Sequence, residues 1–553
     1  MSLWGMIDSV KWFTVYDLLI SIITIGVLIW YAVPIRVHYR WLDFMPSVGM
    51  LLVAASIISG DLDFFTLSNL IYLPAVIVFL CTVKKVFKPT HTIRVPKYRA
   101  LRVILCVCAA APIGLGLTVA GELRYNPASH LGNMSYASAF VKMNERLSAE
   151  YPFGEWKKID WNALRQKYEP IFQQADSNKD RALYVKTLKE YVCSIHDGHV
   201  TLNNEEDMKK EVGGSFGIGI IRLDDGSVFV RSVVSDSTAA QNGIKVGAEI
   251  VNWDRKNGKD ALHDLGCTMT STATEQGKIN NQELFMTRGP VGKTIEVGFK
   301  NWGEKEAKTA TLTAFDDQFK SLRSSASDSE PITGKLLDNG YGYVKITAFP
   351  SDPIGKPEKP LEDLLKLFQK EQAKGLILDL RDNKGGEDDL VAIIAGYFVP
   401  EKKLYEYTSY YNRYMKKFEI NRNETRMIKP ASNVFTGKIA VLINSRTVSS
   451  GEGLPLVMKG MPNVKLIGFT GTNGSFGIVS SRITINMPEG YSANFPDGRS
   501  LNKDKQIQVD SNYTGQGGVA PDIRVPLTRE TFKQVYIDGQ DVLLNEGLRW
   551  LAN

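Results

Sequence analysis

Four long apolar stretches occupy the first 124 residues of the chain. Three of them approach the roughly 20 residues that an α-helix needs to cross a bilayer, and the second is shorter but flanked by aspartates. The pattern predicts an α-helical membrane bundle of about four spans in residues 1–124, with buried core helices as the alternative. The predicted spans are residues 13–33, 46–60, 65–83 and 101–120.

After a polar linker, the spacing of apolar positions becomes helical. Between residues 135 and 192, apolar side chains recur every three or four positions, which predicts three helices. Asp160 is a candidate N-cap for the second helix, and Asp176 or Ser177 is a candidate for the third. We therefore predict a small helical subdomain at residues 125–205.

Short runs rich in β-branched residues follow. SFGIGIIRL and SVFVRSVV are separated by the turn Asp224-Asp225-Gly226, which predicts a hairpin in a β-rich domain at residues 206–305. Residues 306–553 then alternate apolar strands with helical stretches, an order typical of an α/β sheet covered by helices. The predicted strands of this sheet are YGYVKIT, GLILDL, KIAVLIN and VKLIGF.

The placement of basic residues orients the predicted membrane bundle. Arg36 and Arg40 lie between the first and second stretches. Six basic residues lie between the third and fourth, and Arg102 stands at the start of the fourth, whereas the loop between the second and third carries only Asp61 and Asp63. The positive-inside rule makes both basic loops cytoplasmic, which predicts that everything after about residue 121 is extracytoplasmic. A cleaved signal peptide does not account for four successive segments.

The net charge of +6 has a local origin. Residues 1–124 hold a balance of +5 and the remaining residues only +1, so the basicity belongs to the membrane loops and gives no argument for a nucleic-acid partner. Only Cys193 and Cys267 lie beyond the apolar stretches. The two can pair, but neither their number nor their spacing indicates a disulfide scaffold or a zinc site.

Three polar motifs carry the candidate chemistry. Asp197-Gly198-His199 ends the helical subdomain, Gly385-Gly386 follows the strand GLILDL, and Thr447-Val448-Ser449-Ser450-Gly451-Glu452 follows the strand KIAVLIN. The last two motifs follow apolar strands of one predicted sheet and are expected at the same rim. Together the motifs offer a base, a set of backbone N–H groups and a nucleophile, which are the parts of an acyl-transfer site.

Each of these motifs also has a structural interpretation. Ser449 at the start of a helix can be an ordinary N-cap, and the glycine pair can be an ordinary turn. If Ser449 is the nucleophile, the N–H groups of Ser450 and of Gly385 or Gly386 are the candidate oxyanion donors. A metal site at His196, Asp197 and His199 is the alternative for that motif, but no further ligand stands out in the sequence.

The β-rich region resembles a PDZ domain. The resemblance implies that the loop matching Ser215, Phe216, Gly217 and Ile218 offers backbone N–H groups to the terminal carboxylate of a peptide. The strand from about Gly219 would then accept the peptide as an added strand. A purely structural or gating role for this domain is the alternative.

The order of motifs in residues 135–550 is similar to that of the C-terminal processing peptidases, which include the tail-specific proteases and the tricorn-type peptidases. The match comprises DGH, the PDZ-like region, DLRDNKGG, TVSSGE and, near the C-terminus, GGVAPDI. The resemblance implies an α/β catalytic core of the ClpP/crotonase type. It also selects Ser449 over Ser450 as the nucleophile and makes Glu452 the matching acid.

The chain departs from both branches of this family in its base and orienting acid. The tail-specific branch uses a lysine about 25 residues after the serine, where this chain has Gly474 and Ser475. The tricorn-type branch uses a histidine in a D-x-H motif, which points to His199. That branch also places a glutamate four residues before the valine of its GV-x-PD motif, where this chain has Gly515. Either Asp510 or Glu452 is then expected to orient the histidine, or the enzyme works weakly without an orienting acid.

These features predict a membrane-anchored, extracytoplasmic serine endopeptidase that acts on peptides or proteins, with Ser449 as the nucleophile and His199 as the general base. No metal or organic cofactor is implied. The alternatives are a catalytically inactive relative that binds peptides or senses envelope proteins, and a membrane-bundle function such as transport.

Overall fold

The computed structural model describes residues 129–553 except 264, 266–270, 323–329, 353–354, 413–414 and 481. These residues belong to one compact unit, Ala128–Asn553. The four predicted membrane spans lie outside the described residues. Among the helices of the described part, none combines the length and the apolar character needed to cross a bilayer.

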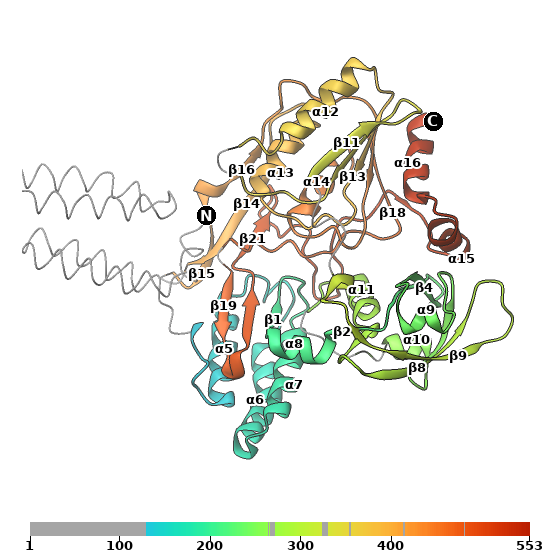
Figure 1. The fold of residues 1–553 in the computed structure, drawn as a ribbon. Coiled ribbons are helices and arrows are strands. Elements are labelled where there is room, and N and C mark those ends of the chain that lie inside the picture. Colours follow the sequence, from blue (N-terminus) through green and yellow to red (C-terminus); the bar gives the residue numbers. More distant parts are fainter. Residues whose placement is uncertain are drawn as a thin grey trace, which may run out of the picture. The chain divides into compact units, whose positions relative to one another are not determined.

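Three helices form the N-terminal part of the unit (Figure 1): α5 (Tyr136–Glu150), α6 (Trp161–Asn178) and α7 (Arg181–Cys193). Asp160 caps α6 as predicted, because its side chain accepts from the backbone N–H of Ala163. The predicted cap of α7 is wrong: Asp180 caps it, and Asp176 lies inside α6. The Asp176 carboxylate instead accepts the N–H groups of Tyr136 and Ala137 at the start of α5.

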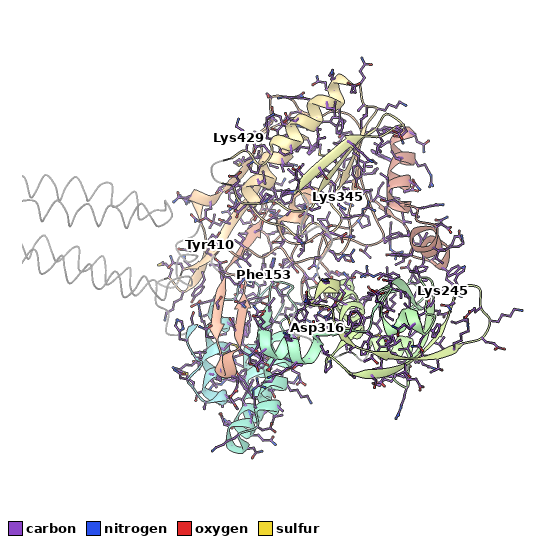
Figure 2. The ribbon with its side chains drawn as sticks, in the orientation of Figure 1. Phe153, Lys245, Asp316, Lys345, Tyr410 and Lys429 are labelled. Atoms are coloured by element: carbon purple, nitrogen blue, oxygen red, sulfur yellow. The ribbon has the colours of Figure 1, made fainter. Side chains whose placement is uncertain are left out.

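The core of this helical part includes a hairpin from far along the chain. Strands β19 (Ile483–Asn486) and β20 (Ser492–Phe495) bury Ile485 and Phe495 against the helices. Strand β1 (Thr201–Asn203) pairs antiparallel with β20. Phe153, labelled in Figure 2, lies fully buried in the same cluster.

The β-rich region is an antiparallel sheet of order β3-β4-β5-β8-β9, with β6 (Lys256–Asn257) paired to β5. The predicted boundary at residue 305 falls inside the β8–β9 hairpin, so the sheet runs beyond it. Helix α11 (Glu275–Met286) packs beside β3, an edge strand of the sheet. The strands are β3 (Ile218–Arg222), β4 (Val228–Val233), β5 (Glu249–Trp253), β8 (Thr294–Lys300) and β9 (Lys308–Thr313).

Shorter elements complete this region. A small antiparallel sheet has the order β10-β2-β7. It pairs β2, which precedes the larger sheet in the sequence, with β10, which follows it. Its strands and the remaining helices are β2 (Gly214–Ser215), β7 (Arg288–Gly289), β10 (Phe315–Asp316), α8 (Glu205–Val212), α9 (Thr238–Gln241) and α10 (Gly258–His263).

The predicted α/β core is present as a mixed sheet of order β11-β12-β13-β17-β18-β22. Strand β11 is antiparallel to β12, and the other neighbours are parallel. All four predicted strands are found. The bounds are β11 (Ile332–Leu336), β12 (Gly342–Ile346), β13 (Leu376–Asp379), β17 (Ile439–Leu442), β18 (Val464–Gly468) and β22 (Ile523–Arg524).

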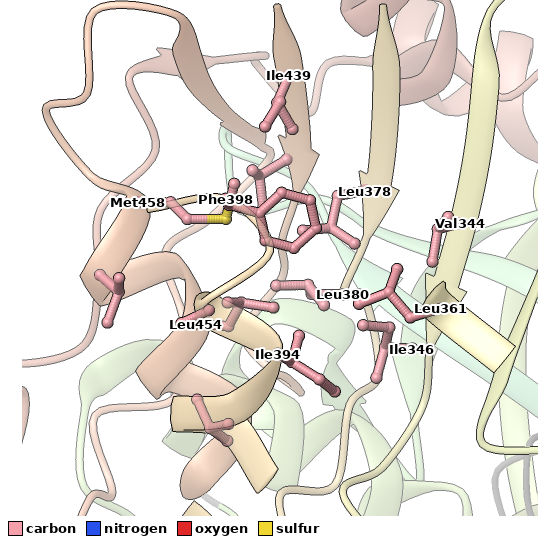
Figure 3. Packing of buried hydrophobic residues seen from close by; sticks show 14 of the residues in the cluster. Val344, Ile346, Leu361, Leu378, Leu380, Ile394, Phe398, Ile439, Leu454 and Met458 are labelled. Atoms are coloured by element: carbon pink, nitrogen blue, oxygen red, sulfur yellow. The ribbon is translucent and has the colours of Figure 1, made fainter. Parts of the chain in front are cut away.

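Helices cover both faces of this sheet, because alternate strand residues point to opposite sides. Leu378 and Val441 pack with α12 (Lys359–Lys370), α13 (Asp388–Ala395) and α14 (Ser450–Met458), as Figure 3 shows for this cluster. Their neighbours Ile377 and Leu442 pack on the other face with α16 (Val542–Ala552). The completely buried strands explain why the sequence reads as continuous apolar runs.

A further sheet is built on the long strand β14 (Lys403–Asn412), which pairs with β15, β16 and β21. Tyr410 of β14, labelled in Figure 2, donates its hydroxyl hydrogen to Glu424 at 2.6 Å. The partners are β15 (Lys417–Ile420), β16 (Arg426–Ile428) and β21 (Gly498–Leu501). Before α16 the chain forms α15 (Arg529–Phe532) and a π-helical turn at Lys533–Ile537.

Candidate active site

Ser449 stands at a sharp turn between β17 and α14. Its φ of 58° and ψ of −136° lie where residues other than glycine are rarely found. Although it occupies the N-cap position of α14, its side chain makes no capping hydrogen bond. The N-cap interpretation is therefore wrong for Ser449, and its hydroxyl is not committed to the helix end.

The glycine pair lies directly against this turn. Gly385 has a φ of 81°, and a Cβ atom there would come within 2.8 Å of the Ser449 Cβ. The Gly385 N–H donates to Asn383 Oδ1 at 2.9 Å, so it is not available to an oxyanion, contrary to the prediction. The Ser450 hydroxyl donates to the Gly386 carbonyl at 2.7 Å. Hydrogen bonding among the described residues leaves the backbone N–H groups of Gly386 and Ser450 without an acceptor.

Glu452 is fully buried in the first turn of α14 and binds the loop at residues 472–475. Its carboxylate accepts the Thr472 hydroxyl, the Gly474 N–H at 2.8 Å and the Ser475 N–H at 2.9 Å. Burial raises the pKa of the Glu452 carboxyl to about 8, and these three donors oppose the rise. The contacts of Glu452 therefore fix a loop and do not involve His199.

The loop that Glu452 fixes joins the two halves of the site. The Ser475 carbonyl accepts the backbone N–H of Ser449 at 3.1 Å. On the other side, a Cβ atom at Gly198 would come within 2.3 Å of the Ser475 Oγ. The turn that carries His199 and the turn that carries Ser449 thus both pack on Ser475. The sequence drew attention to this position only as the place of an absent lysine.

The His199 ring is largely buried, with 10% of its side chain exposed. Its Nδ1 atom has no hydrogen-bond partner among the described residues and lies 4.0 Å from Asp197 Oδ1. Burial lowers the pKa of His199 below the ordinary value, the Asp197 carboxylate opposes this, and Arg482 and Lys157 lower it further. The imidazole is therefore neutral near pH 7, the form that accepts a proton.

Asp510, the other predicted orienting acid, is committed elsewhere. Its carboxylate accepts Lys157 Nζ at 2.9 Å and the Phe476 N–H at 2.9 Å, in a fully buried pair. Burial raises the pKa of Asp510 to about 6, although the Lys157 ammonium lowers it. Neither contact involves His199. The metal alternative also gains no support, because the described residues contain no cluster of three His, Cys, Asp or Glu side chains placed to hold an ion.

The predicted peptide-binding loop is only partly open. The Phe216 N–H donates to the Thr287 carbonyl at 3.0 Å, and the Gly217 N–H donates to Ser215 Oγ at 3.1 Å, so two of the predicted donors are already used within the chain. Ile218 and Gly219 begin the edge strand β3. The Glu283 carboxylate of α11 accepts the N–H of Arg222 at the other end of this strand, at 2.7 Å.

The sequence profile of peptidase family S41 matches residues 340–525, which include the glycine pair and the Ser449 turn. The carboxy-terminal processing protease CtpA of Bacillus subtilis is 25% identical over 389 residues, which cover 68% of this chain and 71% of that protein. CtpB of the same organism is 22% identical over 384 residues, covering 64% of this chain and 70% of the relative.

Solved structures show the same fold. Mature CPAF complexed with lactacystin superposes with a TM-score of 0.54 at 13% sequence identity, covering 75% of this chain and 99% of CPAF. At this identity the likeness concerns the fold alone. It extends well beyond residues 340–525, so the fold is shared over most of the described unit.

Proposed function

This chain is a serine peptidase that carries a family S41 domain and is homologous to the C-terminal processing proteases, and from this premise we propose that Ser449 is its nucleophile and His199 its general base. The observation that carries the proposal is the shared contact of both turns with Ser475. The strained, uncapped position of Ser449 supports it further, because strained backbone is concentrated at functional sites.

The proposed reaction is acyl transfer from a peptide bond. Ser449 Oγ attacks the carbonyl carbon while His199 accepts the hydroxyl proton, and the N–H groups of Gly386 and Ser450 bind the resulting oxyanion. His199 then donates the proton to the leaving amine, and a water molecule hydrolyses the acyl-enzyme by the same steps. In this scheme Glu452 holds the loop at residues 472–475 and takes no part in proton transfer.

The β-rich sheet is proposed to act as a PDZ-like unit that captures a substrate segment. Its edge strand β3 is suited to receive an added strand, and Ile218 and Gly219 lie at the start of that strand. A peptide on β3 would meet Glu283 after a few residues, since this side chain occupies the N–H of Arg222. The substrate class is therefore a protein or peptide that offers a short extended segment.

We propose that the peptidase acts outside the cytoplasm, held by the predicted membrane spans. The distribution of basic residues in residues 1–124 supports this orientation. A second support is that Cys193 is disulfide-bonded, since disulfides persist mainly in oxidising compartments. Cys267, which the sequence offers as its partner, lies outside the described residues.

An alkyl fluorophosphonate probe tests the nucleophile without knowledge of the substrate. The purified full-length chain is expected to be labelled at Ser449, as located by mass spectrometry, and Ser449→Ala is expected to abolish labelling. Ser450→Ala is the matched control, because it keeps the backbone N–H and loses only the hydroxyl, which contacts the Gly386 carbonyl and the Asp388 carboxylate. That variant should still be labelled, at a lower rate. Undiminished labelling of Ser449→Ala would refute the assignment, and absence of labelling in every form would favour a peptide-binding relative.

A further inference from the structure

We propose that Asp197 is the acid that orients the imidazole of His199, in place of the glutamate that the sequence lacks at Gly515. This inference rests on the proposed role of His199 as the base. Its starting point is the buried Nδ1 atom of His199, which has no hydrogen-bond partner among the described residues. A buried polar atom without a partner is costly, and it calls for an explanation from its surroundings. The carboxylate that faces it is Asp197, with Oδ1 at 4.0 Å.

Asp197 is itself rigidly held. It is fully buried, and the Tyr151 hydroxyl donates to its Oδ2 at 2.6 Å. Its Oδ1 accepts the backbone N–H of His199 at 2.8 Å, and its own N–H donates to Ser271 Oγ at 3.2 Å. A carboxylate oxygen can accept two hydrogen bonds, so Oδ1 retains capacity for the ring N–H of His199. The carboxylate is thus held by the Tyr151 hydroxyl and the backbone N–H of His199, and the Asp197 backbone is held by Ser271, before the imidazole is considered.

The two acids expected from the sequence are excluded by their contacts. The Glu452 carboxylate already accepts three donors of the loop at residues 472–475. The Asp510 carboxylate is paired with Lys157 and with the N–H of Phe476. Of these three carboxylates, Asp197 is the one that faces the His199 ring, with 4.0 Å between its Oδ1 and Nδ1 of the histidine.

The separation of 4.0 Å is longer than a hydrogen bond, and closing it needs a shift of about 1 Å by the ring. Catalytic hydrogen bonds are often long in the absence of substrate and tighten when it binds. Because the turn between Asp197 and His199 is short and Asp197 is fixed, a small rotation of the His199 side chain suffices.

The pairing has a definite chemical consequence. A carboxylate at Nδ1 favours the tautomer that carries its proton on Nδ1, which leaves the Nε2 lone pair free to accept the Ser449 proton. The same carboxylate stabilises the imidazolium that forms during the attack. Arg482 and Lys157 act against that cation, and Asp197 is the group that opposes them. Asp197 is therefore a positioning residue, and it does not take the proton itself.

The tautomer of His199 in the wild-type chain is the most direct test. Histidine-selective 15N labelling of the full-length chain, with His199 assigned by comparison with His199→Gln, reports which ring nitrogen carries the proton. We expect Nδ1 to be protonated at pH 8. A proton on Nε2 would overturn the proposal, and this result does not depend on whether any Asp197 variant folds.

The second test compares Asp197→Asn with Tyr151→Phe by the rate of fluorophosphonate labelling at Ser449. The asparagine amide donates to Nδ1 and reverses the tautomer, so labelling is expected to slow by about 10³- to 10⁴-fold. Tyr151→Phe removes a contact to Asp197 but keeps its carboxylate, and it should slow labelling by less than about tenfold. Equal effects of the two variants, or a change below threefold in a folded Asp197→Asn, would contradict the proposal.

The test separates this inference from the proposed function. If His199→Gln abolishes labelling while Asp197→Asn does not, His199 remains the base and only the role of Asp197 fails. If His199→Gln is labelled at the wild-type rate, the proposed function itself fails, and Asp197 has no imidazole to orient. Thermal unfolding of each variant shows whether a loss of labelling reflects a loss of fold.

Discussion

The contacts of Ser449 with the residues around it stabilise its unusual backbone conformation. Residues other than glycine at positive φ cost on the order of 1–3 kcal/mol and persist where neighbours over-determine them. Here the neighbours are Gly385, which allows contact with the Ser449 Cβ, and Ser475, which accepts its N–H. The conformation of Ser449 thus depends on the absence of a side chain at Gly385 and on the carbonyl that Ser475 provides.

Replacement of Gly385 by alanine tests this account. The new Cβ would lie 2.8 Å from both the Ser449 Cβ and the Val448 carbonyl oxygen, and the φ of 81° is itself unfavourable for alanine. We expect fluorophosphonate labelling to fall at least about tenfold and the free energy of unfolding to fall by roughly 1–3 kcal/mol.

Gly460→Ala is the matched control for Gly385→Ala. Gly460 has a similar φ of 82°, but a Cβ there would meet nothing within 4 Å. In the control, the free energy of unfolding should fall because of the unfavourable φ, but the rate of fluorophosphonate labelling should stay unchanged. If both variants are labelled at the wild-type rate, the contact between Gly385 and Ser449 does not hold the nucleophile in place.

Helix α11 is the element that touches both the candidate peptide strand and the loops of the candidate active site. Its Glu283 accepts the N–H of Arg222 on β3 at 2.7 Å, and its Asn280 donates to Ser445, four residues before Ser449, at 2.7 Å. Thr274, the N-cap of α11, donates to the Asn473 carbonyl at 3.2 Å. Helix α11 therefore contacts both the edge strand β3 and the segments that flank the serine turn.

The contact between Glu283 and β3 predicts a pH dependence of stability. Burial raises the pKa of Glu283 to about 7, above the ordinary 4.5, while Arg231, Arg222 and Arg446 oppose the rise. A raised pKa means that the folded chain holds this proton more tightly than the unfolded chain. Its contribution to stability is complete below pH 4.5 and is lost as the pH rises through 7. The loss is about 2–3 kcal/mol, since the side chain is partly exposed.

Glu283→Gln removes this titration. Chemical unfolding followed by tryptophan fluorescence at pH 5 and pH 8 should show a smaller loss of stability in the variant, by about 2–3 kcal/mol. Identical pH dependence in the two proteins would show that folding does not raise the pKa of Glu283, and it would contradict the prediction.

The elements of the α/β core are predictable from the sequence to a degree that the site is not. Buried parallel strands such as Leu376–Asp379 and Ile439–Leu442 are continuous apolar runs. The loops that follow them meet at one rim because parallel strands end at the same edge of a sheet. Asp176 shows the limit. It has the residue type and position of an N-cap, but α6 continues through it, and its carboxylate serves the first turn of α5.

The same limit applies to the residues of the site. The spacing of motifs selects Ser449, His199 and the glycine pair, but it does not show that Asn383 uses the Gly385 N–H or that Glu452 and Asp510 have other partners. These contacts join residues up to several hundred positions apart. They depend on packing, which periodicity and motif spacing do not encode.

At the scale of the whole described unit, a segment near the C-terminus ties the β-rich sheet to the α/β core. Asp224, in the β3–β4 turn, pairs with Arg524 at 2.7 Å, and its N–H donates to the Leu527 carbonyl at 3.0 Å. Phe532 is fully buried against Phe229 of β4, with ring centroids 5.1 Å apart. This attachment follows directly after β22 of the core sheet.

Phe532→Ala is expected to loosen this attachment. Loss of a fully buried phenylalanine costs about 3–5 kcal/mol, and hydrogen exchange should accelerate in β4 more than in the core strands β13 and β17. Ile393→Ala, at a side chain of α13 that is 49% exposed, is the control and should change exchange little. Uniform acceleration in all strands would mean that the sheet and the core unfold as one unit.

The hairpin β19–β20 completes the hydrophobic core around α5, α6 and α7, although it follows α7 by almost 300 residues. During synthesis, the hydrophobic core around the helices that precede His199 therefore stays incomplete until residues 483–495 have been made. The histidine cannot be set in its final place earlier, because β1, which directly follows it, pairs with β20. If His199 is the base, as proposed, a nascent chain is expected to gain peptidase activity only after residues 483–495 have been made.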